Sequence, residues 1–516
     1  MTFQSKLDSL RMKVVVKRER EVMLRVRVWL QSFFEDFGNK PSRTWLVLLI
    51  FALVLQILSI WNLEPSGRDS PRVAGIAREM AVTSNYLIPR LNGENFLEYP
   101  PLGYWPIALG LSMNKKPVGF LAFLPIVLLG TGTVLITYLI GKKLAGERIG
   151  LMAGFILSTM PAFVTYHRQF RVDPALLFFI ALSLYGFAAG YQASRKRFLF
   201  VALFYLGMAG AFLSKGIIGV AIPMGTAVVF LIIKKDLTAM RKLLLRPEFL
   251  FFLLPVLLWV GSVWWLEGPD IIREVIRQSL WRFLSPSTDH AKPFTFYFAR
   301  VFIAPMPWTL LFLVLLWYRW GPTHSREPLL HGSLLKFALV WSLIVFVGLS
   351  MASAKRNLYL GPIYPAVALL AALGWDRIRE KFPKVKRSEA YGLMVVFVLY
   401  IGISLLFISP LEKKESFRSV FEAILNQRTH SPVYLVSPSE EVQGASFFYF
   451  GKRMPVLKIE DFLQGRIEDR QGKTLVIGPL NSGHPLFSTL RSKGYRPLFQ
   501  KKYGGTSVVC VYSNCL

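Results

Sequence analysis

Long uncharged stretches alternate with short charged ones along most of the chain. Residues 44–62 and 118–140 carry no charged side chain. A helix of this length, rising about 1.5 Å per residue, crosses the hydrocarbon core of a bilayer, which is about 30 Å thick. We therefore interpret each such run as a transmembrane helix. Similar runs follow at 149–166, 174–194, 198–214, 216–233, 249–266, 301–318, 337–353, 358–375 and 390–409.

The pattern predicts a polytopic α-helical membrane protein with about 11 to 13 transmembrane helices, a range that allows for re-entrant pieces at short connections. A basic tail, 1–43, precedes the membrane domain, 44–410, and a C-terminal region, 411–516, follows it. With the N-terminus in the cytoplasm, two long loops, 64–117 and 267–300, face outward. Large outward loops predict that the protein acts on that side of the membrane.

The C-terminal region mixes charges of both signs with short β-type runs, separated by glycine, proline and charged residues. Helical patterns at 416–426 and 485–493 would connect such strands. We therefore expect a small extracytoplasmic α/β domain. The predicted strands lie at 432–436, 474–478 and 506–512.

The only two cysteines, Cys510 and Cys515, lie in this region. A disulfide is allowed outside the cytoplasm. One pair five residues apart fits two free thiols equally well. The spacing contains no CxxC pair and therefore no metal-finger signal.

The formal net charge of +30 raises the question of a nucleic-acid partner. The basic residues, however, cluster between apolar runs, and with a cytoplasmic N-terminus every cluster falls on the cytoplasmic side. This distribution follows the positive-inside rule and favours anionic membrane lipids as partners, with no nucleic acid. The clusters are the tail up to Arg43, Lys142-Lys143, 195–197, 234–242 and 377–387.

A set of ionisable residues lies instead at the outward ends of the helices. Such groups are costly at a membrane boundary unless they meet water, a partner or a substrate. Cations grouped with carboxylates favour an anionic ligand, and the phosphate of a membrane lipid is the natural one. Each residue alone also fits a side chain that reaches the interface without binding a ligand. The set includes Asp69, Arg72, Glu98, Arg171, Asp173, Lys215, Lys355 and Arg356.

Five motifs follow one another through the membrane domain. The first is the loop segment that runs from Asp69-Ser-Pro-Arg72 through Glu98-Tyr-Pro-Pro101 to Trp105. The others are Arg171-Val-Asp173-Pro, Leu213-Ser-Lys215-Gly216, His290-Ala-Lys-Pro293 before Pro307-Trp308, and Ser353-Ala-Lys355-Arg356 through Tyr359. In this order they resemble the bacterial GT-C glycosyltransferases, in particular the protein O-mannosyltransferase-like group that includes the lipid A aminoarabinose transferases.

The resemblance implies an integral membrane enzyme that moves a sugar, with inversion, from a polyprenyl-phosphate carrier, usually undecaprenyl phosphate. The acceptor would be lipid A, an envelope glycan or a protein at the periplasmic face of the bacterial inner membrane. The leaving phosphate needs positive charge nearby. The candidates for that charge are Arg72, Lys215, Lys355 and Arg356.

The acceptor needs a carboxylate to orient it and take its proton. By its position in the motif Asp69 is the first choice for this base, and Asp173 is the second choice, as base or as a group that orients the sugar. Further candidates for substrate binding are Glu98, Tyr359 and His290.

Two features depart from the aminoarabinose transferases. Those enzymes typically carry Glu-Lys-Pro in the first loop, where this chain has Glu98-Tyr99-Pro100, and often open the loop with Asp-Glu, where this chain has Asp69-Ser70. One cation is therefore missing. Both departures argue against assigning aminoarabinose as the sugar and leave the transferase class standing.

Three alternatives stay open at this point. A divalent metal near Glu98 and His290 competes with a solvated histidine, because one carboxylate and one imidazole are too few ligands to define a site. A transporter or flippase of a lipid-linked or anionic solute would carry midplane charges in paired halves, and no such symmetry is visible. A non-catalytic scaffold would leave the segment from Asp69 to Trp105 unexplained.

Overall fold

The computed structural model describes most of the membrane domain and of the C-terminal region. The tail 1–40, the run expected at 390–409 apart from single helical positions, His290 and Cys515 lie outside the described residues. The description covers 41–382 and 416–513 except 61–64, 67–68, 114–119, 194–195, 245, 285–291, 321–330, 426–432, 461–473, 482–483, 493 and 503–506, and adds only positions 392, 395, 399 and 402.

Six helices of the described residues are long and apolar enough to cross a membrane. A further pair, α6 (Glu147–Ser158) and α7 (Pro161–His167), counts as a seventh if it forms one span bent by 63°. The polytopic fold is thus confirmed, while the count of 11 to 13 stays a prediction. The six are α5 (Phe120–Ala145), α8 (Asp173–Tyr191), α9 (Arg197–Lys215), η2 with α12 (Pro247–Phe249, Leu250–Glu267), α16 (Gly332–Met351) and η3 with α17 (Asn357–Ile363, Tyr364–Lys381).

Three shorter apolar helices stand at other predicted runs: α2 (Pro41–Ser59), α10 (Ile218–Ile233) and α15 (Thr309–Trp320). The run 301–318 was expected to be one helix, and that prediction is wrong. The chain forms α14 (Phe296–Ile303), then turns, and α15 begins at Thr309. Pro305 and Pro307 occupy the break, and proline lacks the N–H that a continuous helix needs.

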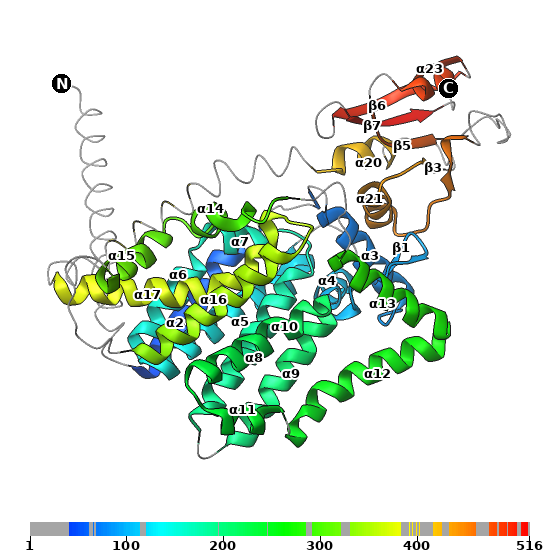
Figure 1. Cartoon of the computed structure of the whole chain (residues 1–516). Helices are drawn as coiled ribbons and strands as arrows, with labels where there is room; N and C mark the ends of the chain where they lie inside the picture. Colours follow the sequence, from blue (N-terminus) through cyan, green and yellow to red (C-terminus); the bar gives the residue numbers. More distant parts are fainter. Residues whose placement is uncertain are drawn as a thin grey trace, which may run out of the picture.

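The helices α8 and α9 pack as a close antiparallel pair. Glycines allow this approach: a Cβ on Gly186 would lie 2.5 Å from the backbone nitrogen of Phe204, and one on Gly207 would lie 2.5 Å from that of Ser183. Small residues at such crossings are typical of membrane helices, where close packing replaces the hydrophobic driving force. The pairing places Asp173, which begins α8, and Lys215, which ends α9, at the same end of the bundle (Figure 1).

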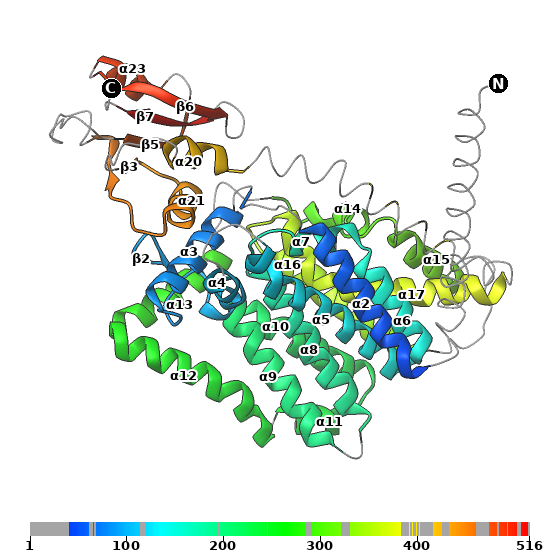
Figure 2. The same ribbon diagram turned by 180° about the vertical axis from the view of Figure 1, so that it is seen from behind.

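The described residues of 64–117, predicted above to be the first outward loop, are largely in secondary structure. They contain α3 (Asp69–Thr83), the hairpin β1 (Arg90–Leu91) and β2 (Glu94–Asn95), η1 (Pro101–Gly103) and α4 (Trp105–Ser112). The second outward loop contributes α13 (Pro269–Leu284), and α11 (Leu237–Leu244) lies in a connection at the opposite end of the bundle. Figure 2 shows α12 at the edge of the bundle, with α13 leading back toward α3.

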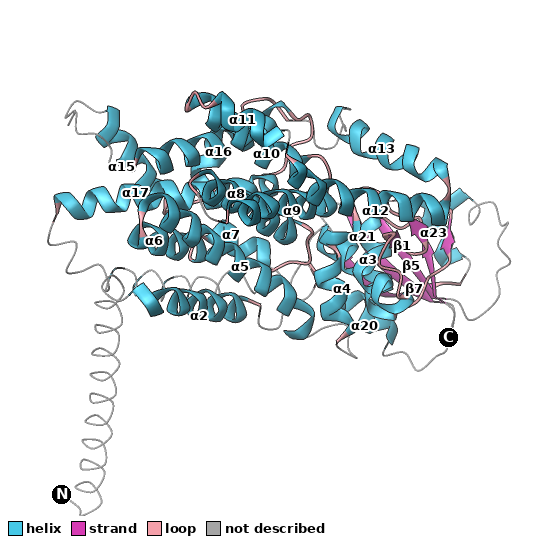
Figure 3. Cartoon of the chain, turned by 90° about the horizontal axis from the view of Figure 1, so that it is seen from below, coloured by secondary structure: helices cyan, strands magenta, loops and turns pink. Residues whose placement is uncertain are grey.

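The C-terminal region forms the expected α/β fold around a five-stranded sheet of order β4-β3-β5-β7-β6. β3 pairs in parallel with β4 and β5, while β7 is antiparallel to β5 and β6. Figure 3 shows these strands gathered at one end of a molecule that is otherwise helical. The elements are α20 (Arg418–Leu425), β3 (Val433–Val436), α21 (Glu440–Phe450), β4 (Val456–Leu457), β5 (Thr474–Asn481), α23 (Pro485–Ser492), β6 (Arg496–Lys502) and β7 (Ser507–Ser513).

This region docks on the first outward loop through α21 and α3. Gly75 and Gly444 meet at the crossing, where a Cβ on Gly75 would lie 2.3 Å from the carbonyl oxygen of Gly444. Asn92 adds two hydrogen bonds, since its side chain donates to the carbonyl of Met454 and accepts from the Met454 N–H, both at 2.8 Å. The contact brings the N-terminus of α21 beside the first turn of α3.

Candidate active site

The carboxylate of Asp69, in the first turn of α3, lies among three guanidinium groups. Its Oδ1 is 2.9 Å from Arg356 Nη1 and 3.4 Å from Arg72 Nη2, and its Oδ2 is 3.4 Å from Arg171 Nη1. Arg72 is one helical turn along α3, whereas the other two arginines come from the loops before α8 and before η3. Three separate parts of the chain thus converge on one carboxylate.

A second carboxylate, Asp173, lies beside the first at the start of α8. Both Nε and Nη2 of Arg171 are 2.9 Å from its Oδ2, and Lys215 Nζ is 2.6 Å from its Oδ1. Only 5% of each side chain of the Arg171–Asp173 pair is exposed. A buried charge is tolerated only when it is paired and hydrogen-bonded in this way.

Arg171 joins the two carboxylates. The sequence placed it in the ionisable set but gave it no role of its own in the reaction. Its position is set by the loop between α7 and α8, where the backbone N–H of Phe170 donates to Ser70 Oγ on α3 at 3.2 Å. The motif Arg171-Val-Asp173-Pro contained the relevant signal, because charged residues two apart at a helix start can face the same ligand or each other. The choice between these two arrangements depends on Asp69, which lies on α3 and is not part of the motif.

Arg72 is the most connected cation of the cluster. Besides Asp69, it lies 3.5 Å from Glu98 Oε2 and 2.5 Å from Glu440 Oε2, and its guanidinium stands 5.3 Å from the ring centre of Phe96. Glu440 begins α21 in the C-terminal region and was also not predicted. The cluster is therefore built from the membrane domain and the C-terminal region together.

Lys215 closes the cluster between two tyrosines. Its Nζ lies 5.4 Å from the ring centre of Tyr99 and 5.0 Å from that of Tyr359, at distances typical of cation–π contacts. Tyr99 stands where the aminoarabinose transferases typically carry a lysine. At this motif position the present chain has an aromatic ring that faces Lys215.

Lys355 and Arg356 are neighbours in sequence but point to different partners. Arg356 reaches Asp69, and its backbone N–H and C=O both bond the Tyr297 hydroxyl, at 3.0 and 2.9 Å. Lys355 is buried and donates to the backbone carbonyls of Lys292, at 3.1 Å, and Ala352. Lys355 is thus held outside the carboxylate cluster, and its part in phosphate binding stays a prediction.

The arginines determine the protonation of Asp69. Burial by itself raises the pKa of this carboxyl, but the positive charges of Arg171, Arg356 and Arg72 outweigh burial and hold the pKa below its ordinary value of 3.8. Asp69 is therefore ionised at neutral pH. In the described cluster four cations (Arg72, Arg171, Lys215, Arg356) face four carboxylates (Asp69, Glu98, Asp173, Glu440).

Seven of the nine candidate residues lie in or against this cluster: Asp69, Arg72, Glu98, Asp173, Lys215, Arg356 and Tyr359. Lys355 lies nearby with its own partners, and His290 falls outside the described residues. Among the residues that the structure describes, no group of three or more histidine, cysteine, aspartate or glutamate side chains is placed to hold a metal ion. The metal alternative stays untested, because it rests on His290.

Comparison with known proteins shows which proteins this chain is similar to. Residues 98–264 match the dolichyl-phosphate-mannose-protein mannosyltransferase family. An uncharacterized protein of Aquifex aeolicus is 29% identical over 70% of this chain and 70% of its own length. Undecaprenyl phosphate-alpha-4-amino-4-deoxy-L-arabinose arabinosyl transferase 1 of Proteus mirabilis is 25% identical over 69% of this chain, and the match spans 65% of that protein.

The fold agrees with these matches. ArnT from Cupriavidus metallidurans, crystallised with undecaprenyl phosphate, superposes with a TM-score of 0.72 over 91% of this chain and 98% of its own length, at 18% identity. The chain is thus similar to the GT-C glycosyltransferases in sequence over residues 98–264 and in fold over most of its length. The described cluster is built from α3, the segment around Glu98 and Tyr99, and the ends of α8, α9 and α21.

Proposed function

We propose that this chain transfers a sugar from a polyprenyl-phosphate carrier, undecaprenyl phosphate in a bacterium, to an oxygen of a lipid A, envelope glycan or protein acceptor. The reaction takes place at the periplasmic face of the inner membrane and inverts the configuration at the sugar carbon. The observation that carries the proposal is the convergence of four cations on the paired carboxylates Asp69 and Asp173 at one end of the helices.

The cluster supports both halves of such a reaction. The acceptor oxygen attacks the anomeric carbon while the bond from that carbon to the carrier phosphate breaks, and the polyprenyl phosphate leaves with the bonding electrons. Negative charge then grows on the phosphate. Arg72, Lys215 and Arg356 are the cations that supply the compensating charge, a contribution that typically amounts to about 3–4 kcal/mol for one well-placed donor.

Asp69 is the proposed base that takes the acceptor proton. In the free protein its pKa is too low for an effective base, because three arginines stabilise the carboxylate. A bound carrier phosphate competes for the same guanidinium groups and so raises the pKa of Asp69 toward the reacting range. Base activation would therefore occur only with the donor in place. Asp173, held by Arg171 and Lys215, orients these groups.

The names of the relatives support a particular carrier lipid but do not decide which sugar this chain transfers. Several are named as aminoarabinose transferases that use undecaprenyl phosphate carriers, which supports that carrier here. Tyr99, which takes the place of a lysine beside the cluster, distinguishes this chain from the pattern typical of those enzymes. The transferred sugar can therefore be a pentose, a hexose or an amino sugar, and the experiment below distinguishes these three classes of donor.

The test is sugar transfer in liposomes that contain the purified chain. Radiolabelled undecaprenyl-phosphate sugars of the three classes would be offered with an envelope extract, and the labelled product fractionated into lipid, glycan and protein. We expect the wild type to label one fraction and the Asp69→Asn variant to lose about 100-fold or more of the rate.

The matched control is Asp270→Asn on α13, which removes an aspartate that is 88% exposed and paired only with Arg273 among the described residues. It should transfer sugar at the wild-type rate. If the folded wild type labels no acceptor from any donor but moves the intact donor across the bilayer, the flippase alternative replaces the transferase.

A further inference from the structure

A second group of cations lies at the far end of the helix pair that carries the active site. α8 begins at Asp173 and ends at Tyr191, and α9 runs back from Arg197 to Lys215. At about 1.5 Å per residue, the end formed by Tyr191 and Arg197 is about 27 Å from the Asp173–Lys215 pair. A ligand bound there is separate from the sugar-transfer site.

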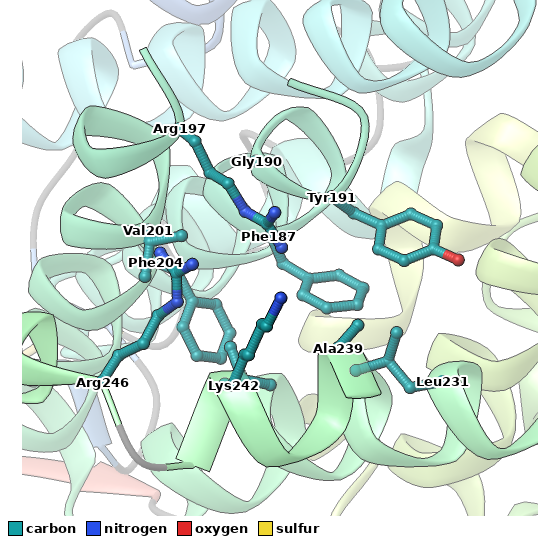
Figure 4. Close-up of a pocket in the computed structure, with 11 residues that line it drawn as sticks. Phe187, Gly190, Tyr191, Arg197, Val201, Phe204, Leu231, Ala239, Lys242 and Arg246 are labelled. Atoms are coloured by element: carbon teal, nitrogen blue, oxygen red, sulfur yellow. The ribbon is translucent and has the colours of Figure 1, made fainter. Parts of the chain in front are cut away.

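A pocket lies at this end, bordered by α8, α9, α10 and α11. It encloses about 380 Å³ of space not filled by atoms, part of it open to solvent. Its walls are mainly apolar and its charged lining is entirely cationic. Figure 4 shows the charged groups of Arg197, Lys242 and Arg246 directed toward the same region of the pocket.

The positive charge of this pocket is only partly balanced. Arg246 Nη1 is 3.1 Å from Glu248 Oε1. Arg197 Nε is buried and makes no hydrogen bond, and within the described part of the chain neither Arg197 nor Lys242 forms an ion pair. The nearby Asp236 is engaged elsewhere, since it accepts from the hydroxyl of Tyr191 at 3.3 Å and from the N–H of Ala239 at 2.9 Å.

Converging cations of this kind repel one another unless an anion lies between them. Two guanidinium groups and one ammonium group match a phosphate, because guanidinium binds two phosphate oxygens at once and ammonium adds a point charge. A carboxylate offers only two oxygens for three cations. The chemistry therefore points to a phosphate group.

The surroundings indicate where that phosphate comes from. Phe198 and Leu199, beside Arg197 in the first turn of α9, are 55% and 59% exposed, and Leu250, at the start of α12, is 50% exposed. Apolar side chains exposed at the end of a membrane-spanning helix pair contact lipid chains. We propose that this pocket binds the phosphate of an anionic phospholipid head group, with the acyl chains along the exposed apolar residues.

The test uses the purified full chain and native mass spectrometry with a short-chain phosphatidylglycerol as the probe. We expect the wild type to bind the lipid and the Arg197→Gln/Lys242→Gln double variant to bind it at least tenfold more weakly. Arg241→Gln is the matched control, because Arg241 precedes Lys242 on the same helix and is exposed but does not line the pocket. Its affinity should equal that of the wild type.

Thermal unfolding checks that each variant is folded, and the single variant Arg197→Gln replaces the double one if the latter is not. If Arg241→Gln lost as much lipid binding as the pocket variant, the binding would be general surface attraction and the proposal would be overturned. The proposal would also be overturned if the folded pocket variant bound the lipid as tightly as the wild type. Displacement of the lipid by inorganic phosphate at the same concentration would assign the pocket to free phosphate and overturn the lipid assignment.

Discussion

The guanidinium of Arg72 lies 2.5 Å from the carboxylate of Glu440, although 368 residues separate the two in the sequence. Arg72 also contacts the partly buried carboxylates of Asp69 and Glu98, whereas the Glu440 side chain is 52% exposed. Exposed ion pairs contribute little, about 0–1 kcal/mol. If the proposed donor phosphate binds Arg72, Glu440 is therefore the carboxylate that it displaces at the lowest cost.

We expect Glu440→Gln to lower the apparent KM for the donor several-fold with little change in kcat, because the variant no longer competes with the phosphate for Arg72. Glu441→Gln, the same change one residue along α21, should leave both constants unchanged. Steady-state transfer kinetics over a range of donor concentrations measure this. A rise in KM for the Glu440→Gln variant would mean that the carboxylate positions Arg72 instead of competing for it.

Arg171 is expected to be indispensable, because it joins Asp69 and Asp173 in a buried position. Arg171→Ala leaves both carboxylates without this partner, and breaking a buried pair in this way costs about 3–5 kcal/mol. Arg171→Lys keeps the charge but not the fork of N–H groups, so we expect a folded protein whose transfer rate is about 100-fold lower.

Thermal unfolding and transfer assays on both variants separate the two effects. The Arg171→Lys variant is the informative one, since it isolates geometry from charge. Wild-type transfer by Arg171→Lys would show that only the net charge at this point matters.

The crossing of α3 and α21 depends on two glycines. Gly444→Ala places a methyl group 2.5 Å from the Cα of Arg72, so the helices must separate. We expect the C-terminal region to become more sensitive to limited proteolysis and the transfer rate to fall. Gly261→Ala on α12, where a Cβ meets nothing within 4 Å, is the control. Unchanged proteolysis of the Gly444→Ala variant would contradict the docking seen here.

The lowered pKa of Asp69 predicts a pH dependence of stability. A carboxyl whose pKa is lower in the folded state contributes stability above its unfolded pKa, near 3.8, and that contribution is lost as the pH falls through the folded value. The Tm difference between wild type and Asp69→Asn should thus be largest at about pH 5–7 and shrink below about pH 3.8. A difference independent of pH would show that the arginines do not stabilise the charged form.

The helical membrane architecture followed from local patterns, because a long uncharged run is unstable anywhere but in a bilayer or a buried core. The same reasoning failed at 301–318, where two prolines broke an otherwise apolar run. In the C-terminal region the apolar strands β3, β5 and β7 were predicted, whereas β6 (Arg496–Lys502) was not. β6 lies at the edge of the sheet, where charged side chains are tolerated and hide the strand pattern.

Most of the candidate site could also be named from the sequence, since the resemblance carried Asp69, Arg72, Asp173, Lys215 and Arg356 as motif positions. The motifs did not separate Lys355 from its neighbour Arg356, because adjacent residues on an irregular segment can point in different directions. Glu440 was missed for a different reason. Its segment is a mixed-charge helix start with no pattern of its own, and only the docking of α21 gives it a partner.

By itself, then, the sequence determined that the chain is a polytopic helical membrane protein and which polar residues stand beside its apolar runs, because hydrophobicity and motif order are local properties of the chain. The tertiary structure decided which of those charges meet. Arg171 and Glu440 acquire their roles from contacts with α3 across 102 and 368 residues of sequence. Ion pairing depends on distances of a few ångströms between side chains, and the packing of glycines and helix ends sets those distances.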